Sequence, residues 1–219
     1  MGGVAHNRRG RMGRMTGTHR EREDKFDVES RFALPELSAL LSEGGHIVRQ
    51  WVDLHSTYCD TDDQRLLVGQ MTLRRREGDT DDGWQLTLPG GRARTEVRFD
   101  LDADDGIPEG LRTLLAGLVA VDELCPVVVV DIERRLQRFL DAADTTVLEV
   151  ADDLVHASVP GEPGVVSRWR EMDVELGAGS EKLLRTVGKR LVAAGTRPST
   201  RASKLARALP GRHPGETAR

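Results

Sequence analysis

The sequence predicts an α+β fold, in which a largely antiparallel β-sheet packs against a small number of helices. Several segments alternate apolar and charged residues with a period of two, which is the side-chain period of a β-strand. Fewer segments carry leucine and valine at helical spacing. With 219 residues, of which 38% are hydrophobic and 31% charged, the chain suits one large domain or two small ones and can bury a core.

The predicted strands follow one another along most of the chain. In the first, "HREREDKF" (19–26), two glutamates and a lysine stand at every second position. The later strands place charged side chains on one face and aliphatic side chains on the other. They are "MTLRRRE" (71–77), "TEVRFDL" (95–101), "TVLEVADD" (146–153) and "REMDVEL" (170–176). Between the first two, "GDTDDGWQLTLP" (78–89) predicts a hairpin turn that leads into a further strand. Alternation in this many segments favours an antiparallel sheet.

Helices are predicted in four segments. The first has a proline near its start and glycines after its end, and the third ends at a glycine, which are common helix boundaries. The four segments are "LPELSALLSEGG" (34–45), "IPEGLRTLLAGLVA" (107–120), "SEKLLRTVGKRLVAAG" (180–195) and "ASKLARAL" (202–209).

The two ends of the chain are predicted to lie outside the folded domain. Residues 1–18 lack apolar periodicity and are rich in arginine and glycine, so we expect a disordered basic arm. The folded domain is expected to cover residues 19–209. Residues 210–219 are expected to form a disordered tail or a linker.

Composition restricts the function classes. The net charge of −4 gives no general reason to expect binding to nucleic acid or membrane. The two cysteines, Cys59 and Cys125, lack the spacing of a metal or redox motif and fit a reducing compartment. The longest apolar run, Val127 to Val130, is too short to span a bilayer, and no signal peptide is visible. We therefore expect a cytoplasmic protein.

The charged strand faces are expected to form the functional site. Their opposite faces are aliphatic enough to carry helices, and a sheet covered by helices on its outer side must turn its charged side into a groove or closed lumen. Arginine matches phosphate oxygens with a planar fork, and clustered carboxylates bind hard divalent metals. Both signs of charge in one cavity therefore indicate metal-assisted phosphoryl or nucleotidyl transfer.

Other site chemistries have little support in the sequence. The six histidines form no HExxH or zinc pattern, and no GxSxG motif occurs. "TVGKR" around Lys189 lacks the upstream glycine of a phosphate-binding P-loop. Nothing near Cys59 marks it as a nucleophile. Only four of the 32 basic residues are lysines, so a lysine is a stronger signal than an arginine; the four are Lys25, Lys182, Lys189 and Lys204.

Glu21-x-Glu23-x-Lys25, followed by an aromatic residue, resembles the ExExK signature of the CYTH domain family. This family is also called the triphosphate tunnel metalloenzymes and includes class IV adenylyl cyclases and thiamine triphosphatases. The resemblance continues in "TYCDTDDQRLLVGQMTLRRRE" (57–77), which is similar to the aromatic-x-D-T and L-R-x-R segments of the family. "RTEVRF", "LEVADD", "WREMDVELG" and "SKLAR" then follow in the family's order, so that the resemblance covers about residues 19–209.

The resemblance implies an antiparallel, eight-stranded, closed β-tunnel with a charged lumen and helices packed outside. It also implies roles for individual residues. The implied ligands of Mg²⁺ or Mn²⁺ are Glu21, Glu23, Glu149, Asp153, Glu171, Asp173 and Glu175. The implied triphosphate-binding residues are Lys25, Arg74, Arg76, Arg94, Arg134, Arg138 and Lys204. Lys25 and Glu23 are the implied catalytic residues.

Two positions depart from the family pattern. Relatives carry a lysine in the strand after the L-R-x-R segment, where this chain aligns Thr87. In "VVVVDIERRLQRF" (127–139) the chain has Asp131 and Glu133 where the family is often more basic. We expect Arg134 to point inward and both acids outward, because a shift of one residue would bring the acids into the tunnel.

The expected function is metal-dependent hydrolysis of a linear triphosphate, inorganic or organic, with a small-molecule polyanion as partner. One alternative is a class IV-type adenylyl cyclase, although an aromatic content of 4% leaves few residues to stack on adenine. A second alternative is a non-catalytic module that binds polyphosphate or a nucleotide, which Thr87 favours. Nucleic-acid binding through the basic arm is a weaker alternative, no membrane partner is expected, and homodimerisation stays open.

Overall fold

The computed structural model describes residues 15–78, 82–90, 93–101, 106–161 and 166–209. Most of the predicted N-terminal arm and all of the predicted tail lie outside these residues. Residues 15–18 were assigned to the arm, and this boundary is wrong: they form the start of a strand. Within the described residues, no helix is long and apolar enough to cross a membrane.

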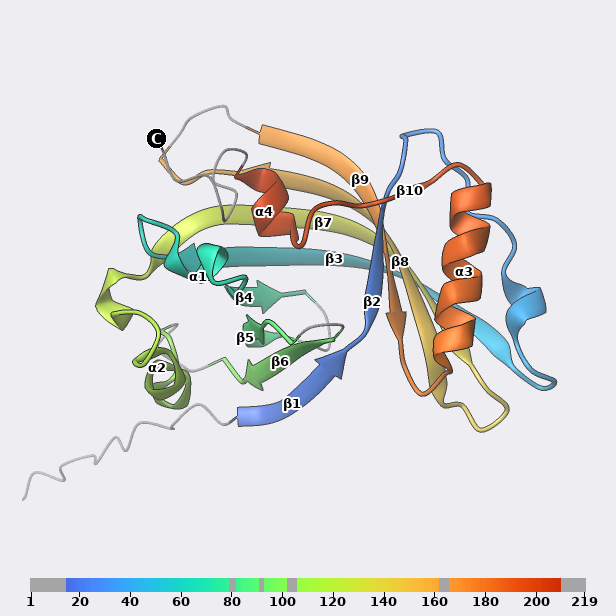
Figure 1. The fold of residues 1–219 in the computed structure, drawn as a ribbon, viewed down its shortest axis with the longest axis horizontal. Helices are drawn as coiled ribbons and strands as arrows, with labels where there is room; N and C mark the ends of the chain where they lie inside the picture. Colours follow the sequence, from blue (N-terminus) through green and yellow to red (C-terminus); the bar gives the residue numbers. More distant parts are fainter. Residues whose placement is uncertain (1–14, 79–81, 91–92, 102–105, 162–165, 210–219) are drawn as a thin grey trace, which may run out of the picture.

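The described strands form one antiparallel sheet in the order β1-β6-β5-β4-β3-β7-β8-β9-β2-β10 (Figure 1). The long central strands curve strongly, so that the sheet wraps around a concave face. The strands are β1 (Met15–Glu21), β2 (Glu23–Asp27), β3 (His46–Asp60), β4 (Thr72–Glu77), β5 (Gly83–Leu88), β6 (Arg94–Phe99), β7 (Cys125–Leu140), β8 (Thr146–Ser158), β9 (Val166–Leu176) and β10 (Arg197–Pro198).

The first predicted strand is split into β1 and β2 by the single residue Arg22. β1 pairs with β6, whereas β2 pairs with β9, near the other end of the sheet. The chain therefore crosses from one end of the sheet to the other at Arg22. The expected count of eight strands is not met, since the sheet has ten strands and no described ladder closes it into a barrel.

Helices lie on both sides of this sheet. α3 (Glu181–Ala193) begins at Ser180, whose side chain accepts a hydrogen bond from the Leu183 backbone N–H at 3.2 Å. α3 packs against the outer face of β2, β8 and β9 through Leu184, Val187 and Leu191. The other α-helices are α1 (Arg65–Val68), α2 (Glu109–Leu115) and α4 (Lys204–Ala208), so the helices predicted at 107–120, 180–195 and 202–209 are present but shorter.

The helix predicted over residues 34–45 is absent. This segment contains only one 3-10 turn, Ser38–Leu40. The Glu36 carboxylate accepts the Ser38 backbone N–H at 2.8 Å, a local bond that competes with helix formation. The leucines of the segment instead pack on the outer apolar cluster around α3, where Leu37 is fully buried. The helical spacing of these leucines in the sequence therefore results from their burial against the cluster, and the backbone of the segment is not helical.

The turn that follows β3 is held by the buried carboxylate of Asp60, in the "YCDT" stretch. Its two oxygens accept backbone N–H groups of Thr61, Leu66 and Leu67 at 2.8, 2.9 and 2.9 Å. These bonds satisfy the free N–H groups at the start of α1, which otherwise has no side-chain cap.

α4 divides the concave face of the sheet into two parts. Leu205 and Ala208 of α4 pack with Leu54, Val130 and other apolar side chains of β3, β7 and β8. This cluster fills one end of the concave face. The rest of the concave face is charged, and it contains the site.

Candidate functional site

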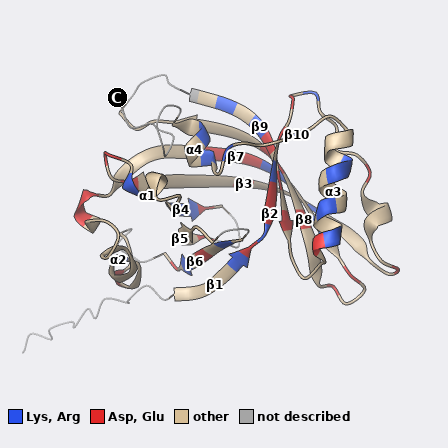
Figure 2. Ribbon diagram, in the orientation of Figure 1, with Lys and Arg blue, Asp and Glu red and all other residues tan. Residues whose placement is uncertain are grey.

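A cavity of about 110 Å³ lies on the charged part of the concave face. Strands from both halves of the sheet contribute to its wall. These strands carry both basic and acidic residues (Figure 2). Its charged wall consists of eight basic and six acidic side chains: Lys25, Arg74, Arg76, Arg94, Arg98, Arg134, Arg138 and Lys204, with Glu21, Glu23, Glu96, Glu149, Asp173 and Glu175. The charged strand faces thus point inward, as expected.

Most of the residues singled out from the sequence line this cavity. Only Asp153 and Glu171 do not; they lie beside it and contact Lys204. Two charged residues of the wall, Glu96 and Arg98, were not selected from the sequence. The signal that could have identified them is their alternation with Val97 and Phe99 in "TEVRFDL", which already placed them on the charged face.

Both departures from the family pattern are visible in the structure. Arg134 points into the cavity, whereas Asp131 and Glu133 are exposed on the outer face, as expected from the favoured register. Thr87 also lines the cavity and is 7% exposed. A neutral hydroxyl therefore stands where relatives of the expected family carry a cation.

One end of the cavity has more carboxylates than the nearby cations neutralise. Burial, followed by repulsion from Glu96, Glu175 and Glu23, raises the pKa of Glu21 to about 7. Burial, with repulsion from Glu149, Glu23 and Glu96, raises the pKa of Glu175 to about 7. Such a set of oxygen ligands is the kind that hard divalent cations prefer. A divalent cation at this end would relieve the repulsion between these carboxylates. Among the described residues, the acidic group whose ligand atoms already lie within 4.8 Å of one another is Asp153, Glu171 and Asp173.

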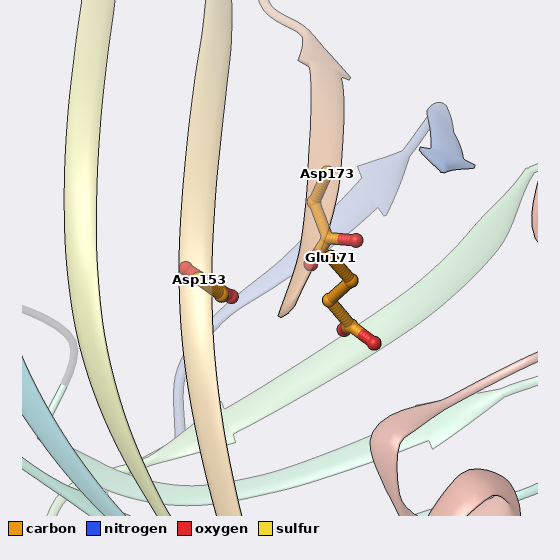
Figure 3. A group of neighbouring side chains, drawn as sticks. All are labelled: Asp153, Glu171 and Asp173. Atoms are coloured by element: carbon orange, nitrogen blue, oxygen red, sulfur yellow. The ribbon is translucent and has the colours of Figure 1, made fainter. Parts of the chain in front are cut away.

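A second acidic group holds a lysine. The carboxylates of Asp153 on β8 and of Glu171 and Asp173 on β9 face a common space (Figure 3), with ligand atoms within 4.8 Å of one another. The Lys204 ammonium lies in that space, with Nζ at 2.9 Å from Asp153, 2.7 Å from Glu171 and 2.9 Å from Asp173. An ammonium has three N–H donors. Lys204 thus takes the position that a cation would occupy among these three carboxylates.

Further basic residues reinforce this lysine-centred cage. Arg134 donates from Nε and Nη2 to the two oxygens of Asp153, each at 2.8 Å. Lys25 bridges Glu23 at 2.7 Å and Asp173 at 3.1 Å. Burial alone would raise the pKa of Asp173, but Lys204 and Lys25 outweigh it and hold that pKa well below its usual range. The cage connects α4 to β2, β8 and β9.

Arg76 differs from the other cations of the wall. Arg74 donates to Gln85 at 2.6 Å, to Tyr58 at 3.3 Å and to Glu96 at 3.4 Å. Arg76 is 7% exposed, its Nε is buried without a partner, and its side chain has no hydrogen bond or ion pair with another described residue. Burial, together with repulsion from Arg74 and Arg134, lowers the pKa of Arg76 to about 9. An anion between these three arginines would relieve that repulsion.

Comparisons with known proteins agree with this architecture. The family model described as "CYTH domain" matches residues 19–208. A protein of Mycobacterium tuberculosis, present in strains CDC 1551 and H37Rv and described only as uncharacterized, is 33% identical over 213 residues. That match covers 90% of this chain and 42% of the relative, so the chain spans less than half the length of the curated relatives it matches.

Two solved structures match this chain, and the first of them has a similar fold. A crystal structure from Bacillus halodurans, described as a candidate adenylate cyclase, has a TM-score of 0.60 at 18% identity and covers 87% of this chain and 98% of that chain. A structure from Hippeastrum, described as a candidate adenylyl cyclase with a dominant triphosphatase activity, has a TM-score of 0.44 at 18% identity. It covers 85% of this chain and 93% of that chain.

Proposed function

The chain belongs to the CYTH domain family, and from this premise we propose that it hydrolyses a linear triphosphate with the help of a divalent metal. The reaction would take place in the charged cavity on the concave face of the sheet. Members of this family are often enzymes, and cavity residues of both signs fit a substrate that carries a metal and several phosphates.

The observation that carries this proposal is the unpaired guanidinium of Arg76. A buried cation without a partner is unfavourable, and here Arg74 and Arg134 repel it further. A phosphate oxygen would supply the missing acceptor and the missing negative charge. A protein that only needed to be stable would gain nothing from such a residue, so we assign it to anion binding.

Different residues of the cavity would bind the phosphates and the metal. Arg74, Arg76 and Arg134 would hold the phosphates and take up the charge that develops on the leaving group. Lys25 is fixed by Glu23 and Asp173, which orients its ammonium toward the cavity. Glu21 and Glu175 would hold the metal, together with Glu23. The bound metal would neutralise phosphate charge and lower the pKa of a bound water.

The assignment of metal ligands is thereby narrower than the resemblance implied. Asp153, Glu171 and Asp173 already surround Lys204, so we propose that they position this lysine and do not bind the metal. Glu149 pairs with Arg138 at 2.7 Å and would act on the metal only through its charge.

We also propose that β1 and β2 act as one bent strand that closes the sheet. Counted in this way, and without the two-residue β10, the sheet has the eight strands of the family tunnel. The carbonyl of Arg22, at the bend, accepts the Leu176 backbone N–H at 2.9 Å, which supports a continuous connection to β9.

The test is phosphate release from tripolyphosphate, ATP and thiamine triphosphate with Mg²⁺, Mn²⁺ or EDTA, beside the double variant Glu21→Gln, Glu23→Gln. We expect metal-dependent release that the variant loses by at least about 100-fold. Formation of cyclic AMP from ATP would instead identify a cyclase. Absence of turnover with tight tripolyphosphate binding in calorimetry would identify a binding module, and Thr87→Lys would then be tested for recovery of activity.

A further inference from the structure

The outer face of the sheet is uncovered in its middle. α2 and α3 lie at opposite ends of the sheet (Figure 1), and their apolar clusters do not include the outward-facing side chains of residues 49–55 on β3 and 131–135 on β7. The two strands pair there, and directly opposite side chains share a face. We call this exposed set the outer strip: Arg49, Trp51, Asp53 and His55 on β3, with Asp131, Glu133 and Arg135 on β7.

The outer strip contains the most exposed large hydrophobic side chain among the described residues. Trp51 is 72% exposed, and the guanidinium carbon of Arg135 lies 4.5 Å from the centroid of its ring. This cation–π contact orders both side chains before any partner binds, so that less conformational entropy is lost on binding. Tryptophan and arginine are also the residue types that most often contribute the largest share of binding energy at protein–protein contacts. The pair is therefore suited to anchor such a contact.

The charges of the outer strip are separated along the strands. One end is basic and carries Arg49 and Arg135. The other end is acidic and carries Asp53, Asp131 and Glu133. Asp53 and Glu133 stand directly opposite each other, and neither has a hydrogen bond or ion pair with the side chain of another described residue. Like charges in such a cross-strand pair are destabilising, so the acidic end would gain stability from an added cation.

A cavity of about 770 Å³ opens at the acidic end of the outer strip. Asp53, Asp131 and Glu133 line it, and no described lysine or arginine contributes to its wall. Carboxylates accept hydrogen bonds, whereas an indole N–H and a guanidinium can only donate them. The basic end carries both of these donors, but Trp51 and Arg135 of the same chain line a different cavity. The acidic cavity can therefore receive this pair only from another molecule.

We propose that the outer strip is the contact between two copies of this chain, related by a two-fold axis that crosses β3 and β7 between Trp51 and Asp53. An axis in the plane of the contact places the acidic end of each copy on the basic end of the other. Arg135 of one copy pairs with Glu133 of the second copy, and Trp51 enters the cavity at the acidic end of the second copy. The strip matches its own rotated image, whereas a uniformly basic or acidic partner would match only one end.

The experiment measures the dimer dissociation constant of the full chain by analytical ultracentrifugation. Trp51→Ser is compared with the matched control Leu114→Ser, because Leu114 is also exposed, at 47%, but lies on α2 outside the outer strip. We expect Trp51→Ser to raise the dissociation constant at least about tenfold, and the control to change it less than about twofold. Circular dichroism checks that both variants are folded.

Charge reversal tests the two-fold arrangement itself. Glu133→Arg and Arg135→Glu should each weaken the dimer, because each brings like charges together across the contact. The double variant should dimerise more tightly than either single variant, because opposite charges then meet again. A chain that stays monomeric at about 100 µM would overturn the inference. So would a dimer that Trp51→Ser does not weaken, or a double variant that dimerises no more tightly than the single variants.

Discussion

Replacing Arg76 by methionine is expected to stabilise the ligand-free protein and to weaken its binding of tripolyphosphate. Methionine keeps a long, flexible side chain in the 7% exposed position but removes the charge. Opposite effects on stability and binding are typical of a residue that serves a site and not the fold.

The magnitude follows from the electrostatics of the cavity. Burial and the neighbouring arginines lower the pKa of Arg76 to about 9, which corresponds to an unfavourable free energy on the order of 4 kcal/mol for the charged form. The unfolded chain carries this charge at every accessible pH. The folded and the unfolded chain both carry the charge at pH 7, so the destabilisation is complete at that pH.

After allowance for lost packing, we expect Arg76→Met to gain about 1 to 3 kcal/mol, or roughly 2 to 10 °C in Tm for a chain of this length. Loss of a charge-assisted hydrogen bond to phosphate should weaken tripolyphosphate binding by about 1.5 to 3 kcal/mol, which is roughly 10- to 100-fold in Kd. Thermal unfolding without ligand measures the first effect, and titration calorimetry measures the second.

The same substitution at Arg134 provides the control. Arg134 makes two bonds of 2.8 Å to the fully buried Asp153, so Arg134→Met leaves a carboxylate with one partner fewer and should lower stability by about 3 kcal/mol. Both variants should bind tripolyphosphate more weakly. If Arg76→Met lowered Tm as much as Arg134→Met, Arg76 would be a structural residue and the reasoning would be refuted.

Three other outcomes follow from the site and the fold. In EDTA, the Tm should fall from pH 5 to pH 8, because Glu21 and Glu175 release their protons near pH 7 in the folded protein but near pH 4.5 in the unfolded chain. Added Mg²⁺ should reverse this trend. Thermal unfolding at both pH values, with EDTA and with Mg²⁺, measures both effects. Lys204→Ala should lower Tm and create a cation site, so that Mn²⁺ raises the Tm of the variant more than that of the wild type. Asp60→Ala should lose about 3 kcal/mol in urea unfolding, because three backbone N–H groups lose their charged acceptor.

The parts of the fold that the sequence predicts well are those with a local signal. Alternation in "TEVRFDL" and "REMDVEL" assigns each side chain to a face, and the structure retains that assignment. β3 was not recognised as a strand because its outward face mixes Trp51 with Asp53 and His55, which obscures the period of two. The leucines of residues 34–45 correctly predict that this segment is buried, but their spacing wrongly predicts a helix.

The sequence does not predict which charged side chains of the site pair with one another and which stay unpaired. Arg74 and Arg76 are equivalent in the L-R-x-R pattern, yet one is paired with Glu96 and the other has no partner. That difference depends on the register between β4, β5 and β6. Likewise, Lys204 enters the carboxylate cage only because α4 packs against β7, a contact between distant parts of the chain.

The crossing of the chain at Arg22 has a consequence for how the protein is made. β1 and β2 are synthesised before their partners β6 and β9, and Glu23 can pair with Glu175 only after β9 has been synthesised. Pairings this distant along the chain form slowly. β1 and β2 therefore stay unpaired while the rest of the domain is synthesised. A nascent chain can form its binding site only after β9 has been completed.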